Sequence, residues 1–397
     1  MRISRRIKAM APSQTVAITD KAKKLRASGV DVVALSLGEP DFDTPQHIKD
    51  AAVAAIEAGC GHYTPNAGLP ELRQAICDKL RRDNGLEYKP ENVIVSSGAK
   101  QSLYNALQAL LDPGDEVVIP APYWVTYPEL VKLSGGVPVE VLAEDDAGFK
   151  MTPQQLDAAC TDKTAAVIIN SPSNPTGVVY TADELTALGE VCLRRGLTVI
   201  ADEIYEKIIY DEAHASVAAL LPKLKPQVVT VNGISKAYAM TGWRLGYVAG
   251  HSDLIKAMSK LQGQITFHPA AVTQHATLAA LNGPEDDVVA MREEFRARRD
   301  YVVGRLSAMP GFSCLMPGGA FYAFPRISGV FGRKTGAGRA LDGSPAVCEA
   351  ILDEAHVALV PGSAFGAPDY LRLSYAAARQ RLETALDRIE NWLATLS

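Results

Sequence analysis

Two cations stand alone in a long stretch of this sequence that is otherwise free of charge. Between Pro226 and Ser252 no other Lys, Arg, Asp or Glu accompanies Lys236 and Arg244. A window so poor in charge is typical of a buried segment, where an ammonium or guanidinium without a partner costs several kcal/mol of folding free energy. We therefore expect both cations to be buried and to serve a bound anion or a reaction.

Further polar residues follow short apolar runs that are typical of strands. Asp202 follows "TVIA", and Tyr205, three residues on, could reach the same ligand. An isolated Asp in this place is more often a helix cap or half of a structural ion pair, but a buried carboxylate could also hold a cationic ligand atom. Asn174 lies in the turn-rich loop of residues 171–177, where Pro175 biases it to extended geometry and aims its amide off the strand end.

Four more candidates have both an ordinary and a functional interpretation. Gly98 lies where a strand turns into a helix, so exposed amides there could bind an anion. Lys100 opposes the helix dipole in the first turn, which an anion would explain, although a solvated surface lysine is simpler. Trp124 lies in a loop, where its ring could stack on a ligand instead of joining the core. Arg372, inside an apolar run, could bind a substrate carboxylate or form an internal salt bridge.

Alternating strands and helices would position these residues. Residues 92–111 predict a strand, a Gly turn and an amphipathic helix, and residues 181–196 predict a helix with Thr181 as N-cap and Gly196 as its stop. Further β-branched strand candidates lie at residues 115–122, 164–175, 197–205 and 227–235. This alternation predicts a mostly parallel sheet covered on both faces, with functional residues at the carboxyl ends of its strands.

Composition limits the class of protein. A chain of 397 residues with 47% hydrophobic and 21% charged residues is typical of a soluble globular protein, long enough for two domains. Its net charge of −5 gives no sign of attraction to nucleic acid or membranes, and no apolar run approaches the roughly 18 residues of a spanning helix. The basic start lacks the apolar region of a secretory signal. Six scattered cysteines without a CxxC pair predict no metal site, no disulfide framework and a cytoplasmic location.

Taken in order along the chain, the motifs resemble the class I, fold-type I pyridoxal-phosphate-dependent aminotransferases, in the branch of the bacterial aspartate and prephenate aminotransferases. The resemblance covers nearly the whole chain: "LSLGEPDFDTP", "HYTPNAGLPELR", "SSGAKQ", "PYW", "NSPSNPTG", "ADEIY", "SKAYAMTGWRLGY" and "RLSYA". Ser-Lys followed by Gly-x-Arg is the most specific part. The resemblance implies an α/β fold, with a large domain at 45–285 around a mostly parallel seven-stranded sheet. Residues 1–44 and 286–397 would form a smaller α+β domain.

The resemblance also implies roles around pyridoxal 5′-phosphate. Lys236 would form a Schiff base with the cofactor and, once released as an amine, move a proton between the substrate Cα and the cofactor C4′. Asp202 would pair with the pyridinium nitrogen, while Tyr205 and Asn174 would hydrogen-bond the phenolic oxygen and Trp124 would stack on the ring. The phosphate would be bound by Gly98, Ala99, Lys100, Arg244 and a hydroxyl of Ser235, and Tyr63 would reach across a homodimer interface to the partner subunit's phosphate.

For substrates, the resemblance implies an amino acid and a 2-oxo acid in a ping-pong cycle. The α-carboxylate would be bound by Arg372, Asn174, Trp124 and the Gly38 backbone. Lys100 would bind the side-chain carboxylate of aspartate or glutamate, which would also explain a lysine in an unfavourable helical turn. Members active on prephenate often carry "KPS" near the start, and this chain has Ala11 in place of that lysine. We therefore expect L-aspartate and 2-oxoglutarate to give oxaloacetate and L-glutamate.

Other functions stay open at this point. The same fold could serve an aromatic, alanine or prephenate aminotransferase, or a related pyridoxal-dependent lyase. A non-enzymatic effector domain of a transcription regulator would need an added DNA-binding domain, and no extension of that size precedes residues 35–45. The Gly- and Arg-rich segment at 331–343 has no functional interpretation.

Overall fold

The computed structural model of this chain describes residues 1–8, 10 and 14–397. Its largest sheet has seven strands in the order β2-β8-β7-β6-β5-β3-β4. Among them β8 runs antiparallel to its neighbours β2 and β7, and the other neighbouring pairs are parallel. The strands are β2 (Val93–Ser96), β3 (Glu116–Ala121), β4 (Val137–Leu142), β5 (Thr164–Asn170), β6 (Thr198–Asp202), β7 (Val228–Gly233) and β8 (Gly246–Ala249). The mostly parallel seven-stranded sheet that the sequence predicts is confirmed.

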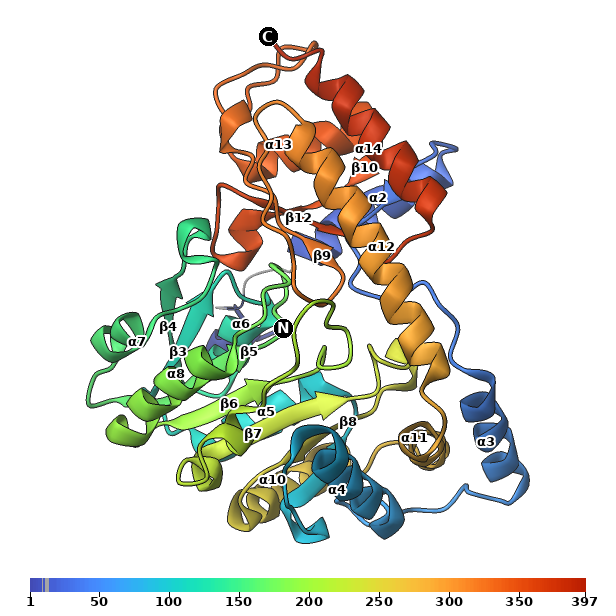
Figure 1. Cartoon of the computed structure of the whole chain (residues 1–397), viewed down its shortest axis with the longest axis vertical. Coiled ribbons are helices and arrows are strands. Elements are labelled where there is room, and N and C mark those ends of the chain that lie inside the picture. The colour runs from blue at the N-terminus through green and yellow to red at the C-terminus, as the bar shows by residue number, and fades with distance from the viewer. Residues whose placement is uncertain (9, 11–13) are drawn as a thin grey trace.

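Alternate residues of the central strands point to opposite faces of this sheet, and helices cover both faces (Figure 1). In β5, Val167 and Ile169 belong to one buried apolar cluster, whereas Ile168 belongs to another. Burial on both faces explains the continuous β-branched runs of these strands. The first face packs against α4 (Pro70–Asn84), α8 (Ala182–Arg195) and α11 (Ala271–Asn282). The second packs against α5 (Ala99–Leu110), α6 (Thr126–Leu133) and α10 (Ser252–Ile265).

The helix α8 begins and ends at the residues that the sequence indicates. The Oγ1 of Thr181 accepts a hydrogen bond from the Glu184 amide at 3.3 Å, and the Thr181 amide donates to Glu184 Oε2 at 2.7 Å. This reciprocal pair satisfies two amides that the first helical turn leaves without partners. At the other end Gly196 adopts a left-handed φ of 70°, which glycine reaches without a steric penalty. The predicted cap and stop are both confirmed.

A second group of elements forms the upper half of the molecule in Figure 1. The strands β9 (Tyr322–Ala323), β11 (Val360–Pro361) and β12 (Leu371–Ser374) form an antiparallel sheet, and β1 (Val33–Ala34) pairs with β10 (Val357–Ala358) in parallel. The helices here are α2 (Gln14–Ala27), α12 (Asp286–Ala308), α13 (Ser344–Ala350) and α14 (Arg379–Leu393). Their apolar cluster includes Ile204 and Tyr205, so the upper half packs directly on the loop that follows β6.

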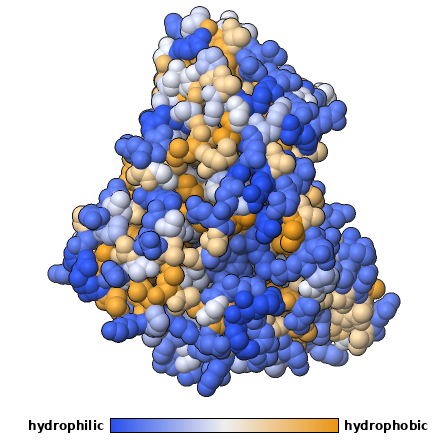
Figure 2. Space-filling view, viewed as in Figure 1, coloured by the Kyte–Doolittle hydropathy of each residue, from blue (hydrophilic) through white to orange (hydrophobic). Residues whose placement is uncertain are grey.

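The remaining helices are α1 (Arg5–Lys8), α3 (Gln46–Glu57), α7 (Pro153–Ala159) and α9 (Val217–Leu220). The face of the molecule in Figure 2 is largely hydrophilic, and several hydrophobic patches lie where its upper and lower halves meet. Within the described ranges, no helix combines the length and the hydropathy that crossing a membrane requires.

The segment at 331–343 forms hydrogen bonds with the residues that follow α14. Lys334 and Ser397 exchange backbone hydrogen bonds of 3.0 Å, and the Arg333 Nη2 donates to the Leu396 carbonyl at 2.6 Å. Arg339 pairs with Asp353 at 3.0 Å. These contacts give the segment a structural role in fixing the residues that follow α14. Ala11, by contrast, lies outside the residues that the structure describes.

Candidate active site

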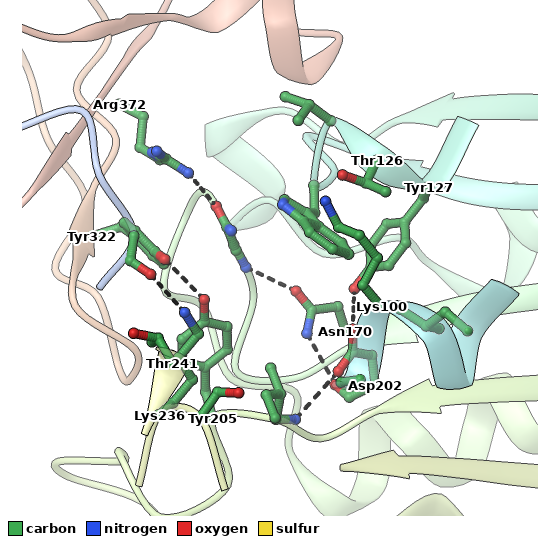
Figure 3. Close-up of a pocket in the computed structure, with 18 of the residues that line it drawn as sticks. Lys100, Thr126, Tyr127, Asn170, Asp202, Tyr205, Lys236, Thr241, Tyr322 and Arg372 are labelled. Carbon is green, nitrogen blue, oxygen red and sulfur yellow. Dashed lines mark hydrogen bonds between the residues drawn. The ribbon is translucent and has the colours of Figure 1, made fainter. Parts of the chain in front are cut away.

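A cavity of about 360 Å³ lies at the carboxyl ends of the sheet strands, and Tyr322 of β9 and Arg372 of β12 also line it (Figure 3). Parallel strands bring their carboxyl ends to one edge of a sheet, which is why residues far apart in the sequence meet here. The sequence-predicted residues that line it are Gly38, Ala99, Lys100, Trp124, Asn174, Asp202, Tyr205, Ser235, Lys236, Arg244 and Arg372. Gly98 lies immediately behind this lining, against Arg244.

Asp202 is a buried carboxylate at the end of β6, and its side chain has no ion pair with any residue that the structure describes. It is 3% exposed and accepts hydrogen bonds from the Tyr127 hydroxyl at 2.7 Å and the Ile204 amide at 3.3 Å. Desolvation raises its pKa to about 6, although the Tyr127 hydrogen bond acts in the opposite direction. The structural ion pair is thereby excluded for the described part of the chain, and the carboxylate is available to a cationic ligand atom.

Lys236 lies on the turn after β7 and points into the same cavity. Its Nζ donates to the Gly38 carbonyl at 2.5 Å. Desolvation lowers the pKa of this amine to about 8, against the attraction of Glu39 and with the help of the positive charges of Arg372 and Arg244. An amine with this pKa is uncharged, and therefore nucleophilic, in a far larger fraction of molecules near neutral pH than an ordinary lysine.

Arg372 is a buried guanidinium, 3% exposed, that has no carboxylate partner within the described ranges. Its Nη1 donates to Asn174 Oδ1 at 2.9 Å and its Nη2 to the Ser36 carbonyl at 2.6 Å, while Nε is buried without a hydrogen-bond partner. Neutral acceptors do not balance a buried positive charge. The sequence allowed either an internal salt bridge or a bound substrate carboxylate for Arg372. The salt bridge is excluded among the described residues, so the substrate carboxylate is the interpretation that remains.

A chain of hydrogen bonds joins this guanidinium to Asp202, as Figure 3 shows. The side-chain oxygen of Asn174 accepts from Arg372, and the backbone amide of Asn174 donates to Asn170 Oδ1 at 2.8 Å. The Asn170 side chain then donates to the Asp202 carbonyl at 2.9 Å. Short polar contacts through Asn174 and Asn170 therefore fix the position of the Arg372 guanidinium relative to Asp202.

The start of α5 forms the anion-binding side of the cavity. Gly98 has a left-handed φ of 87°, and a Cβ built on it would lie 2.6 Å from Arg244 Nη2, so only glycine fits. Gln101 and Ser102 make the first helical bonds to the Gly98 carbonyl, which leaves the earlier amides at the positive end of the helix dipole. Lys100 lies beside them with its Nζ 4.9 Å from the Trp124 ring centroid. Desolvation and the charge of Arg244 lower the pKa of Lys100.

The expectation that Lys236 and Arg244 are both buried is wrong. Lys236 is partly buried, whereas Arg244 is exposed and donates from Nη1 to the Thr241 carbonyl at 2.9 Å. The charge-poor window forms the buried strands β7 and β8. Both cations lie in the connection between these strands, and this connection faces an open cavity. Arg244 itself has a left-handed φ of 55°.

Tyr63 lies outside this cavity. It is 87% exposed, and its ring contacts Phe267 and His268 edge-on, with centroids 5.3 and 5.7 Å away. Within one subunit nothing brings it to the other predicted residues. Its predicted role in a homodimer therefore stays a prediction.

Sequence reasoning missed four residues of the site. Tyr127, Asn170, Ser36 and Tyr322 all contact predicted site residues. Tyr127 had a usable signal, because it lies one helical turn after Trp124 at the start of α6, and Asn170 ends a predicted strand. Ser36 contributes only its carbonyl, and Tyr322 lies in the apolar run "GAFYAF", so neither had a signal in the sequence.

Comparison with known proteins gives matches over nearly the whole chain. The family model of class I and II aminotransferases matches residues 30–389. The chain is 52% identical over 397 residues to the aspartate aminotransferase of Geobacillus stearothermophilus, with 99% of each covered. It is 50% identical over 388 residues to the aspartate/prephenate aminotransferase of Cereibacter sphaeroides, with 97% of each covered. The crystal structure of the aspartate aminotransferase from Rhizobium meliloti superposes with a TM-score of 0.98 at 44% identity, covering 100% of both chains.

Proposed function

The chain belongs to the class I and II aminotransferases, which depend on pyridoxal phosphate, and from this premise we propose that it transfers the amino group of L-aspartate to 2-oxoglutarate. The products are oxaloacetate and L-glutamate. One observation carries the proposal: Arg372, a buried guanidinium without an acid partner in the part of the chain that the structure describes, shares a cavity with Lys236, an amine of lowered pKa. The first can bind a substrate carboxylate, and the second can act as nucleophile and base.

The residues present fit pyridoxal 5′-phosphate. Asp202, buried without an ion pair among the described residues, suits the protonated ring nitrogen. The positive start of α5 at Gly98 and the guanidinium of Arg244 suit a phosphate. Trp124 offers a flat ring at the cavity wall. When bound, the cofactor supplies a sink for the electrons left on the substrate Cα after its proton is removed.

The other cofactor contacts that we propose follow from the same cavity. The phosphate would also be bound by the backbone amides of Ala99 and Lys100 and by Ser235, and the phenolic oxygen by Tyr205 and Asn174. The Oδ1 of Asn174 already accepts from Arg372, so its amide NH2 is the group available for donation. Lys236 would then take the proton from the substrate Cα, because desolvation lowers the pKa of this amine to about 8.

The substrate contacts that we propose use both carboxylates of aspartate. Arg372 would bind the α-carboxylate, and its Nε, buried without a partner, supports this role. The contacts around it would come from Asn174, Trp124 and the Gly38 backbone. Lys100 would bind the side-chain carboxylate, since its ammonium lies at the cavity over Trp124. Prephenate activity, which the name of one relative includes, stays the alternative.

We also propose a homodimer in which Tyr63 reaches the partner subunit's phosphate. The exposure of its ring beside Phe267 supports a role outside its own subunit. The domain limits that we propose are 45–285 for the large domain, and 1–44 with 286–397 for the small one. The separate apolar clusters of the two halves support this division. Six cysteines with free thiols support a cytoplasmic location.

The experiment that tests the reaction is an absorbance titration of the purified, cofactor-loaded protein. Adding L-aspartate should bleach the visible band of the lysine-linked cofactor, and 2-oxoglutarate should restore it. If phenylalanine or alanine bleaches the band and aspartate does not, that amino acid would replace aspartate as the donor. If prephenate restores the bleached band and 2-oxoglutarate does not, prephenate would replace 2-oxoglutarate as the acceptor. The absence of any band after cofactor is supplied would overturn the proposed function itself.

Replacing Lys100 with glutamine should make the enzyme selectively poor with dicarboxylic substrates. Hydrogen bonds to charged groups contribute about 1.5–3 kcal/mol, so we expect the KM for aspartate to rise by about tenfold to a hundredfold. Steady-state kinetics with alanine provide the internal control, since alanine has no second carboxylate and its kcat/KM should change by less than about twofold. An equal loss with both substrates would instead assign Lys100 to the cofactor phosphate.

Loading of the cofactor should depend on pH through the amine of Lys236. Desolvation lowers its folded pKa to about 8, so the uncharged amine that attacks an aldehyde increases as pH rises toward 8 and saturates above it. We expect the rate at which pyridoxal phosphate restores the visible band to the apoenzyme to rise between about pH 7 and 9, with a midpoint at about 8, and to level off above that range. A rate that keeps rising until the range of an ordinary lysine, about 10.4, would contradict the lowered pKa.

A further inference from the structure

Tyr322 is a buried tyrosine at the start of β9 that contacts three groups of the site at once. Its hydroxyl lies 2.8 Å from the Tyr205 hydroxyl, and its ring centroid lies 4.7 Å from the Arg372 guanidinium carbon. A Cβ on Gly38 would collide with the Tyr322 hydroxyl, so the backbone of Gly38 packs directly against it. That same backbone accepts from Lys236 at 2.5 Å.

The fold explains why one side chain can make all these contacts. In the antiparallel pair of β9 and β12, Tyr322 lies opposite Ser374, two residues from Arg372. Residues two apart on a strand lie on the same face, and diagonal cross-strand neighbours are within reach of an aromatic ring. Tyr205 approaches from the other side, on the loop after β6 that packs on the upper half. The Tyr322 side chain therefore lies between Arg372 and Tyr205 (Figure 3).

Hydrogen-bond directions follow from the number of protons. Each phenol hydroxyl has one proton to donate, and between Tyr205 and Tyr322 either could be the donor. If Tyr205 donates to the cofactor's phenolic oxygen, as the proposed function requires, it cannot also donate to Tyr322. The pair is then satisfied only when Tyr322 donates to Tyr205. A tyrosine that accepts one hydrogen bond becomes a stronger donor for the next, because linked hydrogen bonds polarise one another.

We propose that Tyr322 is a positioning residue that fixes the direction of the Tyr205 hydroxyl through its own hydroxyl and braces the Arg372 guanidinium through its ring. This inference rests on the proposed function. It assigns the two parts of the side chain to two separate effects. The hydroxyl acts on the cofactor through Tyr205, and the ring acts on the substrate carboxylate through Arg372, where a cation held over an aromatic face gains favourable interaction.

The first test replaces Tyr322 with phenylalanine, which removes the hydroxyl and keeps the ring. In the cofactor-loaded enzyme, the pH at the midpoint of the visible absorbance change should rise by about 0.5, because a weaker donor at Tyr205 stabilises the deprotonated form less. The kcat should fall by about threefold and the KM for aspartate should change by less than about twofold. Replacement with leucine removes the ring as well, and should add a rise in KM of about fivefold.

The matched control is Tyr370→Phe. Tyr370 lies in the same half, and its hydroxyl accepts from Arg326 Nη2 at 2.6 Å while its ring lies 5.0 Å from that guanidinium carbon. It contacts no residue of the proposed site, so its loss should leave the absorbance midpoint unchanged. A Tyr322→Phe variant that behaves like this control, with an unshifted midpoint, would overturn the inference while the wild-type reaction still stands.

A double-mutant cycle decides whether Tyr322 acts through Tyr205. In a Tyr205→Phe background, Tyr322→Phe should move the absorbance midpoint by less than about 0.2, because its route to the cofactor is gone. Shifts that add in full would overturn the assignment. If the wild-type enzyme forms no visible band with pyridoxal phosphate, the proposed function fails and this inference falls with it.

Discussion

Replacing Lys236 with alanine should reduce transamination by about 10⁴-fold or more, because it removes both the amine that holds the cofactor and the base that takes the Cα proton. No neighbour can substitute for it. Arg372 and Arg244, two other cations that line the cavity, are guanidinium groups that do not lose their protons at working pH, and Lys100 lies at the wall with its Nζ over the Trp124 ring. The measurements are single-turnover kinetics with L-aspartate and the visible absorbance of the reconstituted protein, which should lack the band of a lysine-linked cofactor.

The loss should occur without unfolding. The lowered pKa of Lys236 means that the fold opposes the charged amine, so removing it does not remove a favourable ion pair. We expect the urea midpoint of the apoprotein to stay equal to wild type or rise. Lys236→Arg is the paired variant, since it keeps a cation and a long side chain but offers no uncharged amine, and it should be as inactive as alanine. Turnover above about one per cent in either variant would contradict the assignment.

Local patterns predicted much of this molecule because neighbouring residues decide them. The strands β5 and β6 formed within the runs at 164–175 and 197–205 but end earlier, at Asn170 and Asp202; the continuous β-branched residues before these ends are suited to strands buried on both faces. Thr181 and Gly196 ended their helix through bonds to residues at most four positions away. The site followed from the same information, because the residues after each parallel strand must meet at one edge of the sheet.

Other features depend on which segments meet in space, and a pattern along the chain does not contain that. Ser36 and Tyr322 reach Arg372 and Tyr205 from positions more than 100 residues away. Whether Arg372 had an acid partner could be decided only once its surroundings were known. The prediction that Arg244 is buried failed for the same reason. The low charge of its window correctly indicated that β7 and β8 are buried, but it did not show that the connection between them is exposed at Arg244.

The segment of residues 202–206 shows how packing on both sides of a site residue matters. Asp202 and Tyr205 face the cavity, whereas Glu206 points behind it into a buried cluster with Lys79 of α4 and Asn84. The side chains of Lys79 and Glu206 are 2% and 8% exposed, and they form an ion pair. Asn84 bridges them, accepting from Lys79 Nζ at 2.8 Å and donating to Glu206 Oε2 at 2.8 Å.

Replacing Lys79 with methionine should lower the free energy of unfolding by about 3–5 kcal/mol at pH 7, since removing one partner of a buried pair leaves the other charge uncompensated. Urea denaturation of the apoprotein measures this loss directly. Desolvation acts to raise the pKa of Glu206, but the charges of Lys79 and His214 and the hydrogen bonds from Asn84 and Lys79 lower it to about 2. A carboxylate with a lowered folded pKa contributes stability above its unfolded value, about 4.3, and loses that contribution as pH falls toward the folded value. The difference between variant and wild type should therefore shrink below about pH 4.3.

We expect the large effect of Lys79 on stability to come from its burial and not from the ion pair as such. Lys21, which forms an exposed ion pair, provides the comparison that distinguishes these two causes. Lys21 pairs with Asp353 at 2.7 Å, but its side chain is 37% exposed, so Lys21→Met should lower the unfolding free energy by less than about 1 kcal/mol. In the double variant Lys79→Met/Glu206→Gln the unpaired charge is gone, and part of the stability should return. Equal losses for Lys79→Met and Lys21→Met would show that the cluster behind the site is hydrated. The turn that holds Asp202 and Tyr205 would then depend on the hydrogen bonds of these two residues and on the apolar packing of Ile204 and Tyr205.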